Sequence, residues 1–475
     1  MQSSYSNTIK IIGSGLAGSE AALQLAKLGH AVTLYDMKPI KRSPAHHSND
    51  YAEIVCSNSL GNLQTSTASG LLKSELRLLG CELLKIAESV AVPAGNALAV
   101  DREIFSAKVT EAVQNHPLIT CIAEDVTSLP SNLNDDNYLI IATGPLTSPG
   151  LSESLQKLLK AEHLAFYDAA APIVTRDSIN FDVAFIQDRY NKSSSNQEGA
   201  ENSDAEDSPE GAYINCPLNK EEYEALIAFV LQAKAAEKKD FEKKDAAFFE
   251  SCLPIEELAR RGIDTPRFGP MKPVGLTDPR TGRYPYAAIQ LRQDNTSGTL
   301  YNLVGFQTSL TWGDQKTMIH MIPGLQDAEV IRYGVMHRNT YVNSPTVLLP
   351  NLQLREYPQI QLAGQITGVE GYTECITSGL IAALVLHQKL SGNTTPKIPP
   401  AETMIGSLMR YITRDEVKNF QPINSNWGIF PPLDVPKPIK DKRLRNEKLA
   451  ERALSAMQEF SDELLQPLAV AGSAT

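Results

Sequence analysis

Two cysteines stand in sequence contexts that favour a reactive thiol, and the first of them is Cys56. It directly precedes the run Ser57-Asn58-Ser59, residue types that favour caps and turns, and it follows His46 and His47. An unperturbed thiol has a pKa of about 8.5 and is only a few per cent thiolate at neutral pH. A helix N-terminus or a neighbouring cation would raise the thiolate fraction and make Cys56 a candidate nucleophile.

The second candidate, Cys216, is expected close to a helix N-terminus. Asn219 followed three residues later by Glu222 is a capping-box pattern that opens a helix just after this cysteine. On residue types alone, burial remains the alternative for both candidates, because free cysteine is among the most buried residue types. For three further thiols we expect burial as small apolar side chains: Cys81, Cys121 and Cys252.

A glycine-rich turn near the N-terminus has the residue types and spacing of a dinucleotide-binding site. It follows a β-branched run at residues 8–12 and precedes an Ala- and Leu-rich stretch. In this motif the first glycine permits a tight turn, the second admits a pyrophosphate, and the third lets the helix pack closely on the strand. The helix start binds phosphate, and an acid ending the next strand binds ribose hydroxyls. The expected contacts are Gly13, Ser14, Gly15, Leu16, Ala17, Gly18 and Asp36.

Two later segments favour FAD over NAD as the dinucleotide. Ala142, Thr143 and Gly144 follow an apolar strand and resemble the second contact of two-dinucleotide-type flavoproteins, and Gly364 resembles the third. In that architecture a helix beginning near Gly371 directs its N-terminus at the flavin pyrimidine ring, where negative charge accumulates on reduction. Each segment alone also suits an ordinary strand end, but their order along the chain favours FAD.

A parallel sheet is needed to position these candidate residues. Residues 8–36 alternate strand, helix and strand, and residues 138–142 and 360–364 are apolar runs that predict two further strands. Helices are predicted over residues 68–88 and 373–386. The pattern indicates an α/β fold with a Rossmann-like FAD-binding domain of the two-dinucleotide type.

The middle of the chain differs from both ends. Residues 191–210 are rich in Ser, Asn and acid, which predicts a disordered surface loop, and residues 260–345 have the Gly, Pro and short alternating runs of a β-rich region. We therefore expect a discontinuous FAD-binding domain interrupted by a mixed α/β domain. The expected boundaries are 1–160 and 330–460 for the FAD-binding domain, 161–329 for the insertion and 461–475 for a tail.

Composition places the 475-residue chain among soluble globular proteins. Its 42% hydrophobic and 21% charged residues exclude a chain that is disordered throughout, and also collagen-like and disulfide-scaffold classes. No apolar stretch approaches the roughly 18 residues of a membrane span, and the first residues lack the pattern of a secretory signal. The six scattered cysteines show no zinc-binding spacing. We expect a cytoplasmic protein with reduced thiols, no metal and no membrane association.

The acidic balance of 44 Lys and Arg against 55 Asp and Glu, a net charge of −11, conceals two basic segments. Residues 260–292 hold seven basic and two acidic residues, and residues 437–452 hold seven basic and three acidic ones. Clustered Lys and Arg bind nucleic-acid phosphates, so we expect a phosphate-binding face in the first segment. A solvated helix face explains the second equally well. The candidate RNA contacts are Arg260, Arg261, Arg267 and Lys272.

Seven longer motifs carry a resemblance to a known enzyme family. They are PAHH at 44–47, EIVCSNSL at 53–60, ALAVDR at 97–102, YINCPL at 213–218, RFGPMKPVG at 267–275, RYGVMHRNT at 332–340 and GQITGVEGY at 364–372. In this order they resemble the bacterial folate- and FAD-dependent tRNA (uracil-5-)-methyltransferases, from about residue 8 to about residue 455. The sequence departs from that pattern at 191–210 and at Cys375, where the family more often has a small residue.

The resemblance implies a reaction on tRNA. Methylenetetrahydrofolate would donate a one-carbon unit to C5 of the T-loop uridine at position 54, FADH2 would supply reducing equivalents, and NAD(P)H would re-reduce the flavin. The products would be 5-methyluridine and tetrahydrofolate. The implied partners are tRNA, folate and NAD(P)H, and a monomer is compatible with the sequence.

The same resemblance implies residue roles. Cys56 is the expected nucleophile on uracil C6 and Cys216 the expected base or assisting thiol at C5, with the reverse assignment open. Arg338 and Tyr341 are candidate folate contacts, because arginine suits a carboxylate and an aromatic ring suits the pterin, although a structural turn explains them equally well. Residues 101–102 (Asp-Arg) either bind a cofactor or form an ion pair.

Three other functions compete with this one. The related wobble-uridine modification flavoproteins share the FAD fold and folate chemistry, but they carry a long C-terminal helical extension. A small-molecule FAD oxidoreductase would need neither paired cysteines nor a basic surface. A non-catalytic FAD-bound RNA-binding protein would not need both cysteine motifs intact.

Overall fold

The computed structural model describes residues 8–43, 45–129, 137–160, 164–169, 171–189, 213–234, 253–334, 336–414, 420–437 and 439–470. The acidic segment 191–210 and Cys252 lie outside the described residues, so the predictions made for them are not tested.

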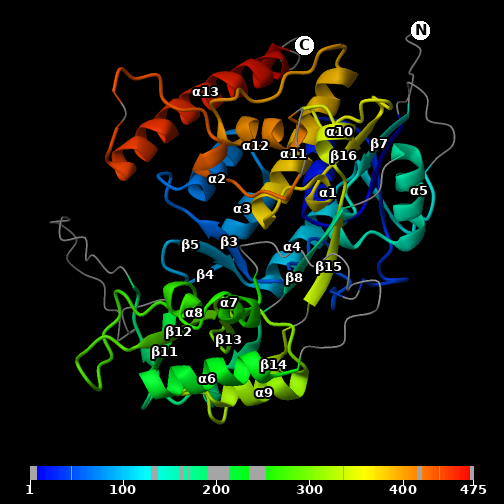
Figure 1. Ribbon diagram of the computed structural model, residues 1–475. Coiled ribbons are helices and arrows are strands. Elements are labelled where there is room, and N and C mark those ends of the chain that lie inside the picture. The colour runs from blue at the N-terminus through cyan, green and yellow to red at the C-terminus, as the bar shows by residue number, and fades with distance from the viewer. Residues whose placement is uncertain are drawn as a thin grey trace, which may run out of the picture.

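A five-stranded parallel sheet lies at the centre of the larger of two bodies (Figure 1). Its strand order is β16-β7-β1-β2-β6, and every neighbouring pair is parallel. The strands are β1 (Thr8–Ile12), β2 (Val32–Asp36), β6 (Ile119–Ala123), β7 (Asn137–Ile141) and β16 (Ile360–Leu362). The predicted strands and the α/β fold class are confirmed. The edge strand β16 joins the sheet from the far end of the chain.

Two helices from opposite ends of the sequence cross above this sheet. They are α1 (Leu16–Lys27) and α11 (Tyr372–Leu390). A Cβ on Gly379 would lie 2.1 Å from the carbonyl oxygen of Ala17, so the two backbones touch at that point. This contact fixes the start of α11 beside the glycine turn that opens α1.

The helix predicted over residues 68–88 is two helices, α2 (Ala68–Leu78) and α3 (Glu82–Ser89). Gly80 between them has a φ of +70°, a left-handed conformation that ends a helix, and its N–H donates to the carbonyl of Arg77. The buried carboxylate of Glu20 on α1 then accepts hydrogen bonds from the first N–H groups of α3. The break therefore has a local cause in Gly80 and a tertiary one in Glu20.

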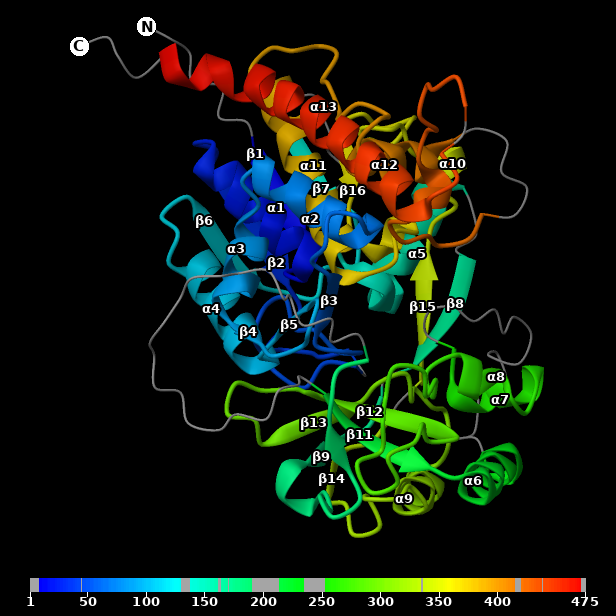
Figure 2. The ribbon, with the colours of Figure 1, turned by 90° about the vertical axis from the view of Figure 1, so that its left-hand side faces the viewer.

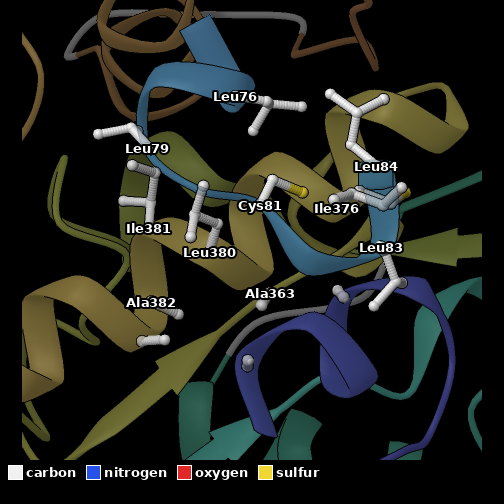
Figure 3. Close-up of a cluster of buried hydrophobic side chains, with 14 of the residues drawn as sticks. Leu76, Leu79, Cys81, Leu83, Leu84, Ala363, Ile376, Leu380, Ile381 and Ala382 are labelled. Atoms are coloured by element: carbon white, nitrogen blue, oxygen red, sulfur yellow. The ribbon is translucent and has the colours of Figure 1, made fainter. Parts of the chain in front are cut away.

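Cys81 lies in this break and is buried, as predicted. Figure 3 shows its thiol among the apolar side chains of Leu76, Leu84 and Ile376. Cys121 is only half-buried, because it lies on the edge strand β6. Burial raises the pKa of both thiols.

A small antiparallel sheet and several helices complete the larger body. The sheet has the order β3-β5-β4, and in both views α13 runs along the outside of α2 (Figure 2). The elements are β3 (Ser59–Asn62), β4 (Ala91–Val92), β5 (Ala97–Val100), α4 (Arg102–Gln114), α5 (Pro149–Leu159), α10 (Ser344–Val347), α12 (Met404–Thr413) and α13 (Lys442–Val470). Helix α13 continues through residues where we expected the tail to begin.

The second body is built on a six-stranded sheet of order β10-β11-β12-β13-β9-β14, in which all neighbouring strands are antiparallel. The strands are β9 (Ile173–Thr175), β10 (Phe185–Ile186), β11 (Tyr213–Leu218), β12 (Ala287–Gln293), β13 (Leu300–Leu303) and β14 (Val330–Arg332). Its helices are α6 (Lys220–Gln232), α7 (Ile255–Arg261), α8 (Thr265–Phe268) and α9 (Trp312–His320). This body has an apolar core of its own, and we call it the insertion body.

A two-stranded antiparallel ribbon connects the two bodies (Figure 2). It consists of β8 (Leu164–Ala169) and β15 (Met336–Tyr341), the segments by which the chain enters and leaves the insertion body. Among the described residues, no helix has the length and apolar character needed to cross a membrane.

Candidate active site

A cavity of about 370 Å³ opens beside the glycine turn, at the ends of strands β1, β2, β7 and β16. Ligands of open α/β sheets bind at this edge of the strands. Most of the residues predicted to hold a cofactor line it together. They are Gly13, Gly15, Leu16, Ala17, Asp36, Ala142, Thr143, Gly144 and Gly364.

The three glycines of the turn do what their spacing predicts. Gly13 has a φ of +102°, and a Cβ there would lie 2.5 Å from the carbonyl oxygen of Ala142. A Cβ on Gly15 would meet nothing within 4 Å, whereas a Cβ on Gly18 would lie 1.8 Å from the carbonyl oxygen of Gly13. Gly15 thus leaves the turn open toward a ligand, while Gly18 allows helix and strand to touch.

Asp36 is held in place by its own neighbours at the end of β2. One carboxylate oxygen accepts hydrogen bonds from the backbone N–H of Ser14 at 2.8 Å and from its hydroxyl at 2.5 Å. The other accepts from the N–H of Lys38 at 2.8 Å. Ser14 is buried and does not line the cavity, and both of these hydrogen bonds orient the Asp36 carboxylate.

Two helix N-termini border the cavity without a side-chain cap. Gly15 precedes α1 and Gly371 precedes α11, and neither helix has a capping side-chain hydrogen bond. Gly371, Tyr372 and Cys375 of the second helix all line the cavity. Uncapped N–H groups and a positive dipole end favour anionic groups at both places.

Cys56 lines the same cavity and is half-buried. Its backbone N–H donates to the hydroxyl oxygen of Tyr372 at 2.8 Å, and the N–H of Ser57 donates to the same oxygen at 3.2 Å. Burial, and after it the charge of Cys56, raises the pKa of Tyr372 well above its ordinary value. The tyrosine is therefore a neutral phenol that holds the cysteine segment.

His46 also lines the cavity but is not the cation that the sequence led us to expect. Its Nδ1 lies 2.5 Å from the hydroxyl oxygen of Ser43. Burial, and secondarily the charge of Lys38, lowers its pKa, so the ring is neutral at pH 7. Lys38 instead places an ammonium group in the cavity wall. Burial lowers the pKa of this lysine as well.

The structure does not bring Cys216 to the cavity. This thiol lies within strand β11, is fully buried in the core of the insertion body and faces apolar side chains. The capping box of Asn219 and Glu222 is present at the start of α6. Burial nevertheless raises the pKa of Cys216 to about 12, so the prediction of a lowered pKa was wrong for this arrangement.

Of the two candidate folate contacts, Tyr341 is a core residue. It is buried, its hydroxyl donates to the carbonyl of Phe420 at 3.2 Å, and its ring meets the Phe420 ring edge to face at 5.9 Å. The structure describes the backbone of Arg338 on β15 but not its side chain. The neighbouring Asn339 lines the cavity, and sequence reasoning missed it.

The four candidate RNA residues lie in or directly after α7 and α8, but their roles differ. Arg260 and Arg261 are exposed, and Arg260 forms an ion pair with Glu257 one turn earlier in α7. Lys272 is half-buried. Arg267 serves the fold, because it donates to the carbonyl of Tyr286 at 2.8 Å and stacks on that ring at 4.0 Å.

Residues 101–102 form contacts between the two bodies, and neither of them lines the cavity. Arg102 pairs with Asp294 at 2.8 Å, and Asp101 caps α4 while accepting from the N–H and hydroxyl of Thr296. Arg292, counted above in the basic run, is also buried at this junction, so it does not belong to the exposed face.

A family model and curated relatives both match most of this chain. A model described as glucose inhibited division protein A matches residues 8–394. The methylenetetrahydrofolate–tRNA-(uracil-5-)-methyltransferase TrmFO of Anoxybacillus flavithermus is 51% identical over 96% of this chain and 100% of its own length. The protein of the same name from Brevibacillus brevis is 50% identical, over 96% of this chain and 98% of its own.

A similar fold occurs among solved structures. Two crystal forms of Aquifex aeolicus GidA superpose with a TM-score of 0.65 at 17% identity. In the form II crystal the match covers 98% of this chain and 76% of that chain. At this identity the likeness concerns the fold alone.

Proposed function

The chain belongs to the family of the methylenetetrahydrofolate–tRNA-(uracil-5-)-methyltransferases, and we propose that its cavity joins an FAD site to a uracil site at Cys56. The chain transfers a one-carbon unit from methylenetetrahydrofolate to C5 of uracil in tRNA, with FAD as its redox cofactor. One observation carries the proposal: Cys56 lines the same cavity as the glycine turn, Gly364 and the start of α11. We place the target at uridine 54 of the T loop.

The residues present fit an FAD. The glycine turn has no side chain in the way of a ligand, and both helices that border the cavity have uncapped N-termini. The start of α1 would hold the pyrophosphate, Asp36 the ribose hydroxyls, and the start of α11 the pyrimidine edge of the flavin. When bound and reduced, FAD would supply the two electrons that convert the transferred methylene into a methyl group. We assign the reduction of the flavin itself to NAD(P)H.

The chemistry assigned to Cys56 follows from the weak nucleophilicity of uracil C5. Its thiolate adds to C6, the sulfur–carbon bond forms, and the electrons of the C5–C6 double bond move into an enolate. C5 then attacks the methylene carbon, and the bond from that carbon to one of the two folate nitrogens breaks. A base takes the C5 proton while the bond to the other folate nitrogen breaks, which releases tetrahydrofolate and leaves an exocyclic methylene on the ring. A hydride, which bound and reduced FAD would supply, converts this methylene into the methyl group, and expulsion of the thiolate restores the C5–C6 double bond. The two N–H bonds to Tyr372 hold the backbone from which this sulfur reaches the ring.

The base at C5 is a separate question. A role for Cys216 requires a rearrangement of the insertion sheet, because its thiol lies in an apolar core and has a pKa of about 12. We keep Cys216 as the second thiol of such a rearranged state. In the described arrangement, the groups lining the cavity that can accept a proton include His46 and Glu53.

We assign tRNA binding to the basic residues in and after α7 and α8 of the insertion body. Arg260 and Arg261 are exposed at the end of α7, and Lys272 lies in the loop after α8. The first residue of α7 donates its N–H to the carbonyl of Gln307 at 2.8 Å, and Gln307 lines the cavity. Phosphates bound along α7 would therefore leave the target base near the cavity.

Expression in a strain that lacks T-loop methylation tests the proposed function. We expect 5-methyluridine at position 54 to return, with its methyl carbon derived from folate and not from S-adenosylmethionine. A flavin-containing protein that restores no methylation would favour a small-molecule FAD oxidoreductase. Modification at the wobble uridine instead would favour the related flavoprotein family.

A further inference from the structure

The segment that carries Cys56 has no regular secondary structure and is held by tertiary contacts. Cys56 lies between the end of β2 and the start of β3, within residues 53–58 that form neither helix nor strand. Besides the bonds to Tyr372, the residues on either side of it, Val55 and Asn58, bond to buried polar groups. The position of the sulfur therefore depends on what those groups contact.

One of these groups is the guanidinium of Arg102, the first residue of α4. It donates through Nη1 to the carbonyl of Val55 at 3.3 Å. Through Nε and Nη2 it donates to a single carboxylate oxygen of Asp294, at 3.1 and 2.8 Å. The side chains of Arg102 and Asp294 are 9% and 6% exposed, so the pair is shielded from water. One side chain thus joins the cysteine segment to the insertion body.

The other group is the side-chain amide of Asn58. Its nitrogen donates to the carbonyl of Gln293 at 2.8 Å, and its oxygen accepts from Arg292 at 3.0 Å and from Asn302 at 3.2 Å. The same Asn302 donates to Asp294 at 3.1 Å. Both contacts of the cysteine segment therefore end on the same corner of the insertion body, at the end of β12 and on β13.

We propose that Arg102, Asp294 and Asn58 form a positioning unit that makes the placement of Cys56 depend on the placement of the insertion body. The inference rests on the proposed function, in which Cys56 attacks uracil and the insertion body binds tRNA. Because the bonds of Arg102 to Asp294 and the bonds of Asn58 cross the junction, and Arg102 and Asn58 hold the chain on the two sides of Cys56, a shift of one body relative to the other moves the thiol. None of the three residues lines the cavity, so they position the nucleophile rather than react.

Two variants distinguish a role in positioning Cys56 from a role that only holds the two bodies together. Arg102→Met leaves the buried carboxylate of Asp294 without its ion-pair partner, although Asn302 still donates to it, and should lower both the melting temperature and the activity. Arg102→Met combined with Asp294→Leu removes both charges and should restore the melting temperature, since an apolar pair can replace a buried ion pair at little cost. The double variant still lacks the bond to Val55. We expect its kcat to stay at least about tenfold below that of the unmodified enzyme, since small misplacements of reacting groups cost up to roughly a hundredfold.

The experiment measures kcat, KM for tRNA, bound FAD and the rate of covalent capture of a 5-fluorouridine tRNA. The proposal predicts low kcat and slow capture in the double variant, with KM and FAD content within about twofold of the unmodified enzyme. Recovery of kcat together with the melting temperature would overturn it, as would a loss confined to KM. Arg77→Met, which removes an exposed ion pair with Glu88, is the control and should change none of these values. If the unmodified enzyme methylates no tRNA, the proposed function itself fails, which is a different result.

Discussion

The backbone N–H of Cys56 donates a hydrogen bond to the hydroxyl oxygen of Tyr372 at 2.8 Å. Tyr372 is the first residue of α11, so the bond ties the candidate nucleophile to the helix end that borders the flavin part of the cavity. The same oxygen accepts from Ser57, and the phenol still carries a hydrogen that it can donate. The candidate nucleophile and the helix end are thus fixed relative to each other.

Tyr372→Phe should weaken catalysis more than cofactor binding. The change removes the acceptor of two N–H groups and leaves the ring, so the cysteine segment loses its tether while the helix stays packed. We expect a loss of about 1–3 kcal/mol in unfolding free energy and a larger relative fall in kcat than in bound FAD. Thermal unfolding, flavin absorbance and steady-state rates measure the three quantities. An unchanged kcat would show that the tether is dispensable.

Cys56 and Cys216 should differ in capture of a substrate analogue. Cys56→Ala should abolish methylation and the covalent complex with a 5-fluorouridine tRNA. Cys216→Ala should keep the covalent complex, because this thiol does not line the cavity and burial raises its pKa to about 12. Cys81→Ala serves as a control for the loss of a buried thiol. The opposite pattern, capture kept without Cys56 and lost without Cys216, would exchange the two roles.

Gly18→Ala should prevent FAD binding. The new Cβ would lie 1.8 Å from the carbonyl oxygen of Gly13, so α1 would be forced off β1 and the phosphate-binding turn would open. Gly313→Ala, in α9, is the matched control. A Cβ there would meet nothing within 4 Å, and alanine in a helix gains up to about 1 kcal/mol over glycine. The flavin absorbance of the two purified variants distinguishes them, and a yellow Gly18→Ala protein would refute the packing argument.

Neutralising Arg260 and Arg261 should weaken tRNA binding and flatten its salt dependence. The two guanidinium groups are exposed at the end of α7, where each can contact a phosphate. Loss of a phosphate contact lowers the slope of log K against log salt by about one. Filter binding across a range of salt concentrations gives both numbers. Arg77→Ala, on α2 of the other body, should leave both unaltered, and an unaltered slope in the double variant would place the tRNA elsewhere.

The pair of His30 and His387 should make the larger body acid-sensitive. Their ring nitrogens lie 2.9 Å apart, and burial lowers the pKa of both below the ordinary value. As the pH falls below about 6.5, these two histidines become protonated in the unfolded chain before they do so in the folded chain. The stability due to this pair is therefore complete above about pH 6.5 and falls as the pH drops through the lowered folded values.

Melting temperatures between pH 5 and 8 test that dependence. The His387→Gln variant keeps a polar side chain but does not titrate, so its melting temperature should fall less on acidification than that of the unmodified protein. Parallel curves for the two proteins would assign the acid sensitivity to other groups.

The parts of the site that the sequence predicts are those determined by neighbours along the chain. The glycine turn, Asp36 and the start of α11 depend on short patterns, and all of them border the cavity. Two other contacts join residues far apart in sequence, so no local pattern predicts them. They are the hydrogen bond from Cys56 to Tyr372 and the ion pair of Arg102 with Asp294. Cys216 shows the same limit, because a capping box predicts a helix start but not the burial of the strand before it.

The strand order of the central sheet also bears on how the protein is made. Strands β1, β2, β6 and β7 leave the ribosome early, but β16 and α11 follow only after the whole insertion body has been synthesised. The insertion body, with its own sheet and core, can fold first, since domains generally fold as units during synthesis. The nascent chain must therefore hold four strands of an unfinished sheet until β16 arrives, and the cavity wall that Gly364 and the start of α11 form is incomplete until then.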